Sequence, residues 1–298
     1  MFYKKATKWL AALLVAAWLV GVPETGLAQT VPPATVLHER GVDAGDRSAA
    51  RETAGKKCLF IGHSFFIPVA KVFKNHAAKA GVDDHSQQAV FAGGQGGSPG
   101  RLWQNQKKRK EIQKILDGGH VQLLGMTYFN SSLGDYRKWI DYALEKNPKT
   151  EFFIGMPWGK DGPSRSVESF ASVSSRAQSE FYPEVVKKLR ELYPKNRFYW
   201  INYGRVAVEL KRAYEDGALP LVKQPVSRNG SDSIFRDQMG HAAPLTLEMA
   251  SLVWLSVLYD VESADCRWRH QGAAKLEAIL KKIVEQEKSY NPAGPAEN

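Results

Sequence analysis

The stretch Cys58-Leu59-Phe60-Ile61-Gly62-His63-Ser64 decides the predicted fold. Its first four residues are apolar and include aromatic and β-branched side chains, which is typical of a buried strand. Gly62 then permits a tight turn, and Pro68 suits the first turn of a helix. The pattern predicts a strand over 58–61, a turn that exposes the Ser64 hydroxyl, and a helix over 68–80.

Strand and helix signals alternate through the rest of the chain. Short apolar stretches predict further strands over 89–91, 121–127, 151–155 and 198–202. Helical periodicity predicts helices over 102–116, 136–145, 174–192, 205–216, 244–259 and 273–287. Such alternation predicts an α/β fold, a three-layer αβα sandwich around a five-stranded parallel sheet. Ligand sites in such folds lie at the carboxyl ends of the strands.

The N-terminal segment reads as an export signal. Three lysines precede the unbroken apolar run Trp9–Val20, and Gly26-Leu27-Ala28 supplies small residues for cleavage. A membrane anchor is the alternative, but the run is shorter than the roughly 20 residues of a span. We therefore expect a signal peptide over 1–28, a flexible leader over 29–54, one domain over 55–290 and a disordered tail over 291–298. The mature protein is expected to be periplasmic or extracellular, with no integral membrane segment.

Charge and cysteine content narrow the class of partner. The net charge is +10, and the signal carries three lysines and one glutamate, which leaves +8 for the mature chain. The cluster at 107–110 suits an anionic polymer, or more simply a solvated helix face. Export argues against a nucleic-acid partner. Cys58 and Cys266 either pair or stay free, and no histidine spacing indicates a metal site or another cofactor.

A second segment, Asp232-Ser233-Ile234-Phe235-Arg236-Asp237-Gln238-Met239-Gly240-His241, complements Ser64. Asp237 and His241 lie four residues apart beside a turn, so a carboxylate can orient a histidine base. With Ser64 they form the inventory of a serine hydrolase: nucleophile, base and carboxylate. Taken singly, Ser64 also fits a helix N-cap, and the Asp–His pair also fits a surface turn.

Two more features follow predicted strands at the same edge. The loop Gly93-Gly94-Gln95-Gly96-Gly97-Ser98 lacks the lysine of a phosphate-binding loop, and its backbone N–H groups suit an oxyanion instead. Asn130 follows the third strand, and its amide is a second candidate donor. The alternatives are a flexible surface loop and a turn-forming asparagine.

Together these residues resemble the SGNH/GDSL hydrolase superfamily, over about residues 57–260. The matching positions are Ser64, Gly94 (or Gly93), Asn130 and His241, in the order of the family. The resemblance implies a flavodoxin-like SGNH-hydrolase fold, with Ser64 as nucleophile and oxyanion donor. It also implies oxyanion donors at Gly94 and Asn130, and His241 as base oriented by Asp237. The chain departs from the family at His63, in its Asp–His spacing and in its third block.

We therefore expect an exported serine esterase that cleaves acyl groups from a carbohydrate or cell-wall polymer, with a small-molecule or polysaccharide ester as substrate. The alternatives are a catalytically silent protein that binds glycans or anionic polymers, and a lipase or thioesterase. Trp158, His63 and Tyr128 are the candidate substrate-binding residues, since aromatic faces stack on sugars and pack acyl chains. The Ser/Gly-rich stretch 159–179 is a candidate lid or specificity loop.

Overall fold

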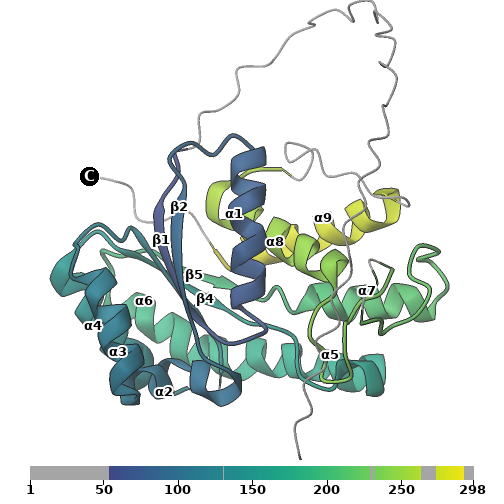
Figure 1. Ribbon diagram of the computed structural model, residues 1–298, viewed down its shortest axis with the longest axis horizontal. Coiled ribbons are helices and arrows are strands. Elements are labelled where there is room, and N and C mark those ends of the chain that lie inside the picture. The colour runs from purple at the N-terminus through teal and green to yellow at the C-terminus, as the bar shows by residue number, and fades with distance from the viewer. Residues whose placement is uncertain (1–53, 130, 229, 231, 263–272, 292–298) are drawn as a thin grey trace, which may run out of the picture. The chain divides into compact units, whose positions relative to one another are not determined.

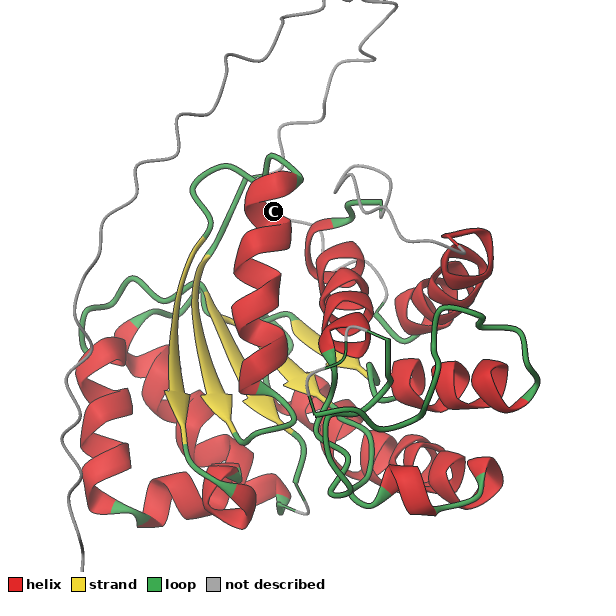
Figure 2. Ribbon diagram, turned by 45° about the vertical axis from the view of Figure 1, so that its right-hand side comes forward, coloured by secondary structure: helices red, strands yellow, loops and turns green. Residues whose placement is uncertain are grey.

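The computed structural model describes residues 54–129, 131–228, 230, 232–262 and 273–291. Within these residues five parallel strands form one sheet in the order β2-β1-β3-β4-β5. All arrows of the sheet point the same way in Figure 2. This order is that of flavodoxin-like doubly wound folds. The strands are β1 (Lys57–Gly62), β2 (Ser86–Phe91), β3 (Leu123–Thr127), β4 (Glu151–Gly155) and β5 (Phe198–Ile201).

Helices cover both faces of this sheet, which confirms the predicted three-layer sandwich (Figure 1). One face carries α1 (Ile67–Lys79), α7 (Arg205–Glu215), α8 (Pro244–Tyr259) and α9 (Ala273–Ser289). The other face carries α2 (Pro99–Gln104), α3 (Gln106–Leu116), α4 (Leu133–Lys146), the π-helical segment η3 (Ala177–Lys187) and α6 (Lys188–Leu192). Shorter pieces at the sheet edge are η1 (Gly94–Gly97), η2 (Gly162–Ser164) and α5 (Val167–Arg176).

The core divides into two layers because central strands bury both faces. Phe60 and its alternate neighbours pack against α1 and α8, where Trp254 contacts the Phe60 ring at 5.6 Å between centroids. Leu59 and Ile61 face the other way, toward α2, α3 and α4. Apolar residues at consecutive positions in β1 therefore serve two cores, which explains the continuous apolar run in the sequence.

Strand register brings several segments to one edge of the sheet. Gly62 pairs with Phe91 of β2, Ile61 pairs with Met126 of β3, and β3 and β4 end opposite each other at Thr127 and Gly155. The loops that follow these strands therefore leave the sheet at the same side. This edge carries Ser64, the glycine loop and the residues after β3 and β4.

Two predicted elements differ from the structure. The helix predicted over 102–116 is two helices, because Asn105 is extended and its side chain caps α3 by accepting the Lys108 N–H at 3.1 Å. The predicted loop over 159–179 is largely helical, since Ser166 caps α5 and the helix continues into η3. The segment is therefore mostly helix and not loop, and its role as a lid or specificity element stays a prediction.

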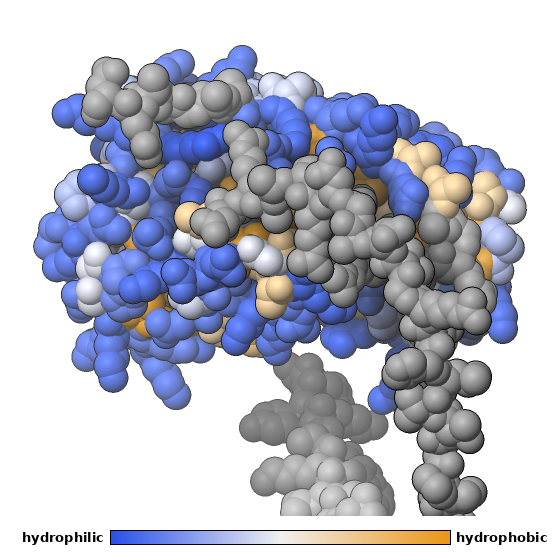
Figure 3. Space-filling view, turned by 90° about the horizontal axis from the view of Figure 1, so that it is seen from above, coloured by the Kyte–Doolittle hydropathy of each residue, from blue (hydrophilic) through white to orange (hydrophobic). Residues whose placement is uncertain are grey.

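The predicted signal peptide, the leader up to residue 53, Cys266 and most of the tail lie outside the described residues, and those predictions stay predictions. Cys58 is a free, buried thiol, and burial raises its pKa to about 12. Among the described residues, no helix is both long and apolar enough to span a membrane. Figure 3 views the molecule from the amino ends of the strands, where the visible surface is mostly hydrophilic with small, separate apolar patches.

Candidate active site

Ser64 lies in a tight turn between β1 and α1. The backbone N–H groups of Phe66 and Ile67 both donate to the His63 carbonyl at 3.0 Å, and α1 begins at Ile67, three residues after the serine. Gly62 is required here because a Cβ at this position would lie 2.8 Å from the Phe66 ring. The turn thus holds Ser64 at the carboxyl edge of the sheet, with its side chain partly exposed.

His63 is a structural part of this turn. Its Nδ1 accepts the Phe65 N–H at 3.2 Å, so the proton of the neutral ring is on Nε2, which lies 3.1 Å from the Thr127 hydroxyl. Burial, and secondarily the nearby His241, lowers the pKa of His63 to about 4. The side chain is 2% exposed. His63 lines the substrate cavity described below, but both ring nitrogens are occupied, so it has no hydrogen-bonding capacity left for a substrate.

The four-residue spacing of Asp237 and His241 closes into a bonded pair. Asp237 Oδ2 accepts the His241 Nδ1–H at 2.7 Å, and Asp237 Oδ1 accepts the His241 backbone N–H at 3.1 Å. Gly240 bends the intervening loop at a φ of +87°, a conformation that favours glycine. The carboxylate therefore holds both the ring and the backbone of His241.

His241 reaches Ser64 with its other nitrogen. Its Nε2 lies 3.0 Å from Ser64 Oγ, and with the proton on Nδ1 this nitrogen accepts the serine hydroxyl. Burial acts to raise the pKa of Asp237, but the His241 hydrogen bonds and the Arg236 charge outweigh it and lower that pKa. Asp237 is thus ionised at neutral pH. Ser64, His241 and Asp237 form an unbroken hydrogen-bonded chain.

Aromatic residues fix the position of the His241 loop. The Trp158 indole N–H donates to the Gly240 carbonyl at 2.7 Å, and Phe65 stacks on the His241 ring at 5.0 Å with planes 13° apart. Trp158 also packs edge-on against Phe65, and the Phe65 carbonyl accepts the Tyr203 hydroxyl at 2.8 Å. Trp158 is 3% exposed and its N–H is engaged. It supports the loop over 237–241, which we call the base loop. It also lines the cavity beside Ser64, and its predicted contact with a substrate stays a prediction.

The glycine loop lies beside the turn of Ser64. Gly97 packs so closely on β1 that a Cβ would lie 2.7 Å from the Gly62 carbonyl. At Gly93 and Gly94, in contrast, a Cβ would meet no atom within 4 Å, and Gly94 has a φ of +49°. Both glycines line the same cavity as Ser64. The loop is anchored at one end and open where the oxyanion donors are predicted.

The residues after β3 are only partly described. Tyr128 lines the cavity, with its ring edge-on to Phe181 at 4.5 Å, and burial raises the pKa of its hydroxyl. Asn130, the predicted side-chain oxyanion donor, lies outside the described residues. Asn202, which follows β5 at the same edge, is fully buried, and its backbone N–H donates to Glu287 at 2.7 Å. It is therefore a structural residue.

A cavity of about 710 Å³ adjoins Ser64 and His241, which we call the substrate cavity. Its apolar walls come from the carboxyl end of β2, from the segments after β1, β3 and β4, and from the base loop: Phe65, Phe91, Tyr128, Phe129, Met156, Pro157, Trp158, Val173 and Met239. No local motif identifies the contributions of Phe65, Phe129, Met156 and Val173, because they depend on which loops meet at this edge of the sheet. Tyr128 and Trp158, in contrast, were predicted from the sequence as candidate substrate-binding residues.

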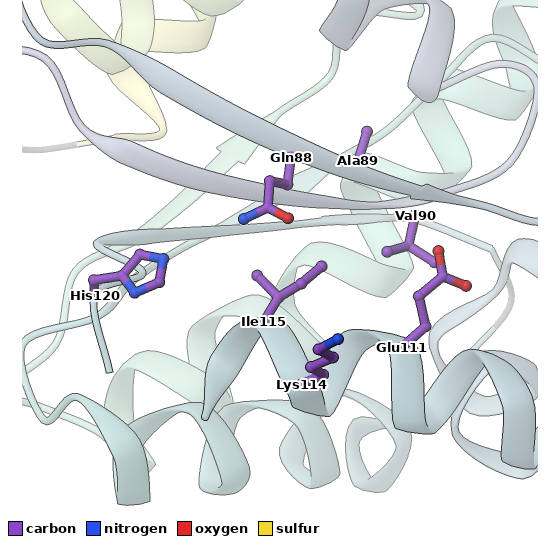
Figure 4. A pocket seen from close by; sticks show the side chains of 7 residues that line it. All are labelled: Gln88, Ala89, Val90, Glu111, Lys114, Ile115 and His120. Atoms are coloured by element: carbon purple, nitrogen blue, oxygen red, sulfur yellow. The ribbon is translucent and has the colours of Figure 1, made fainter. Parts of the chain in front are cut away.

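A second hollow, of about 590 Å³, lies between the outer edge of β2 and α3 (Figure 4). The labelled Gln88, Glu111, Lys114 and His120 side chains line it, and no bonded nucleophile–base pair is among them. Within the described part of the chain, no group of three or more His, Cys, Asp or Glu side chains is arranged to hold a metal ion.

Comparison with known proteins gives little information on the function of this chain. No protein-family model and no curated protein matches the chain. Among solved structures, the periplasmic domain of a lipopolysaccharide acetyltransferase from Salmonella ser. Paratyphi A is similar at 13% identity and a TM-score of 0.42. The match covers 72% of this chain and 88% of that domain. A similarity of this strength carries no activity from that protein to this one, so a functional assignment depends on the geometry at Ser64.

Proposed function

We propose that this protein is an exported serine esterase of the SGNH type that cleaves acyl groups from a carbohydrate or cell-wall polymer. The observation that carries the proposal is the hydrogen-bonded chain from Ser64 Oγ through His241 to Asp237. Nucleophile, base and orienting carboxylate at hydrogen-bond distances are the constellation that activates a serine. Its position beside an open cavity gives an ester access to the hydroxyl.

The reaction proceeds in two steps. Ser64 Oγ attacks the acyl carbon while His241 Nε2 takes the hydroxyl proton and Asp237 stabilises the resulting imidazolium. The oxyanion accepts hydrogen bonds from the backbone N–H groups of Ser64 and Gly94, or Gly93, and from the Asn130 amide. His241 returns the proton to the leaving alcohol. Water then attacks the acyl carbon as His241 takes its proton, the bond to Ser64 Oγ breaks to release the carboxylic acid, and His241 gives the proton back to Ser64 Oγ. No cofactor takes part.

The signal peptide predicted over 1–28 supports export, and the hydrogen-bonded Ser64, His241 and Asp237 side chains support acyl chemistry. A lipase or thioesterase would use the same three side chains and differ only in the groups on either side of the carbonyl. The substrate cavity, not the triad, therefore determines which ester is cleaved.

Hydrolysis of p-nitrophenyl acetate by the purified protein tests the proposal. Ser64→Ala should lower kcat by a factor on the order of 10⁴ or more, since the nucleophile is removed, without changing the thermal unfolding curve. Ser289→Ala, an exposed serine in α9, is the matched control and should keep full activity. Wild-type turnover by Ser64→Ala would remove the basis of the assignment.

A further inference from the structure

Apolar side chains gather at the mouth of the substrate cavity. Among the described residues three large hydrophobic side chains are exposed: Phe91 at 48%, Leu192 at 49% and Met239 at 59%. Two of the three, Phe91 and Met239, line the substrate cavity. They come from segments almost 150 residues apart, one at the end of β2 and one in the base loop. Exposed apolar side chains that converge on one site mark a surface that binds an apolar partner.

The interior of the substrate cavity continues this apolar character. Among the described residues that line the cavity, the polar side chains besides those of Ser64, His241, His63 and Trp158 are Gln95, Tyr128 and Lys160, and the Lys160 ammonium lies 3.7 Å from an Asp161 carboxylate oxygen. The nitrogens of His63 and Trp158 already have protein partners. A sugar presents a hydroxyl at almost every carbon, and each would lose its water here without gaining an equivalent partner. The lining therefore suits a hydrocarbon better than a sugar.

The position of the apolar walls relative to the triad decides which part of the ester they contact. Phe65 stacks on the His241 ring, so apolar surface begins directly beside the base. In the proposed substrate the alcohol is a carbohydrate, and the acyl group is the apolar part. We propose that the substrate cavity binds the acyl group and selects acyl chains longer than acetyl, with Phe91 and Met239 as the specificity residues at its mouth. This inference rests on the proposed function and specifies its acyl group.

Met239 is well suited to this task. It directly precedes Gly240 and His241, so the loop that carries the base also carries one wall of the mouth. Its backbone carbonyl accepts the Asp161 N–H at 3.1 Å, which holds the main chain while the side chain stays exposed. An unbranched thioether adapts to chains of different length. The backbone of Met239 is thus held in place, while its side chain can adapt to the acyl chain that enters the cavity.

A chain-length series of p-nitrophenyl esters measures the selectivity. The value of kcat/KM should rise about fourfold for each methylene that enters the cavity, and at least about tenfold in total between acetate and octanoate. The highest kcat/KM on acetate, with a steady decline toward octanoate, would overturn the inference and leave the esterase assignment intact.

Matched variants locate the selectivity. Met239→Gln, which keeps the length of the side chain, and Phe91→Gln should each lower the octanoate-to-acetate ratio of kcat/KM by about fivefold. Leu192→Gln makes the same kind of change at the third exposed hydrophobic residue, which does not line the cavity, and should leave the ratio at the wild-type value. Equal effects of all three variants would contradict the assignment of Phe91 and Met239.

Binding without turnover separates this inference from the proposed function. Calorimetric titration of Ser64→Ala should show tighter binding of p-nitrophenyl octanoate than of the acetate, and Met239→Gln in that background should weaken the octanoate alone. Preference for octanoate in Ser64→Ala with no hydrolysis by the wild type would support the apolar site and refute the esterase. Equal affinity for both esters would refute the apolar site, whatever the wild type hydrolyses.

Discussion

Trp158→Phe tests whether the position of His241 depends on the indole that supports its loop. The substitution keeps an aromatic ring edge-on to Phe65 but removes the N–H that donates to the Gly240 carbonyl at 2.7 Å. Gly240 adjoins His241 directly, so the loop loses a fixed point one residue from the base. Trp158 is a positioning residue in this account, because it acts on the reaction through His241.

The expected magnitude follows from these contacts. A buried carbonyl left without its donor costs about 1–3 kcal/mol of stability. A displacement of the base by about 1 Å costs on the order of 10² in rate. We therefore expect kcat on p-nitrophenyl acetate to fall by about 10- to 100-fold, with a smaller change in KM.

Trp200→Phe is the matched control for this experiment. Its indole is also buried and also donates a hydrogen bond, to Gln178 at 2.9 Å, but it does not line the substrate cavity. Both variants should lower the midpoint of thermal unfolding, and only Trp158→Phe should slow hydrolysis and the rate at which Ser64 reacts with a fluorophosphonate. Equal loss of stability in both, with the wild-type labelling rate retained in Trp158→Phe, would refute the positioning role.

Further predictions concern the carboxylate, the glycine loop and two buried titratable groups. Asp237→Asn should lower kcat by roughly 10³-fold, because the amide no longer fixes the Nδ1–H tautomer of His241; steady-state kinetics with an unchanged unfolding curve would show this. Gly94→Ala keeps the backbone N–H but should cost about 1–2 kcal/mol from its φ of +49° and reduce kcat more than KM; full activity at wild-type stability would contradict the argument that this backbone conformation positions the donor. The pKa of His63 is about 4 in the folded protein against about 6.5 in the unfolded chain. Its contribution to the free energy of unfolding, on the order of 3 kcal/mol, is therefore present above pH 6.5 and lost as the pH falls toward 4. Urea unfolding of His63→Asn should lack this pH dependence. Burial raises the pKa of Glu287 to about 7, so the pH dependence of its contribution to stability has the opposite sign: this contribution decreases as the pH rises from about 4.5 to 7. Glu287→Gln should remove that decrease, and an unchanged dependence of the unfolding free energy on pH would contradict the burial argument.

The sheet was predictable where burial leaves a continuous apolar run. The strand predicted over 151–155 has those bounds in β4, and the prediction for 198–202 differs from β5 by one residue. The strand β2 was only half recognised, because Ser86, Gln87 and Gln88 lie on the outer edge of the sheet. An edge strand has one side toward solvent, and its polar residues carry no strand signal.

The candidate site was predictable where its residues sit in short motifs. Ser64, Asp237 and His241 belong to local patterns, and strand-end geometry placed the glycine loop beside them. The contacts of Trp158 with Gly240 and of His63 with Thr127 join segments more than 60 residues apart. No local pattern encodes such pairs. His63 and Trp158 were therefore predicted as substrate contacts, whereas the structure gives their nitrogens to the protein.

Reaction of the intact protein with a fluorophosphonate probe, followed by mass spectrometry of its peptides, tests the central claim most directly. An activated serine attacks phosphorus, and an ordinary capping serine does not. The account predicts one adduct, on Ser64, that is absent in Ser64→Ala and forms far more slowly in His241→Ala. No adduct on Ser64 in the folded wild type, or equal labelling in His241→Ala, would contradict it.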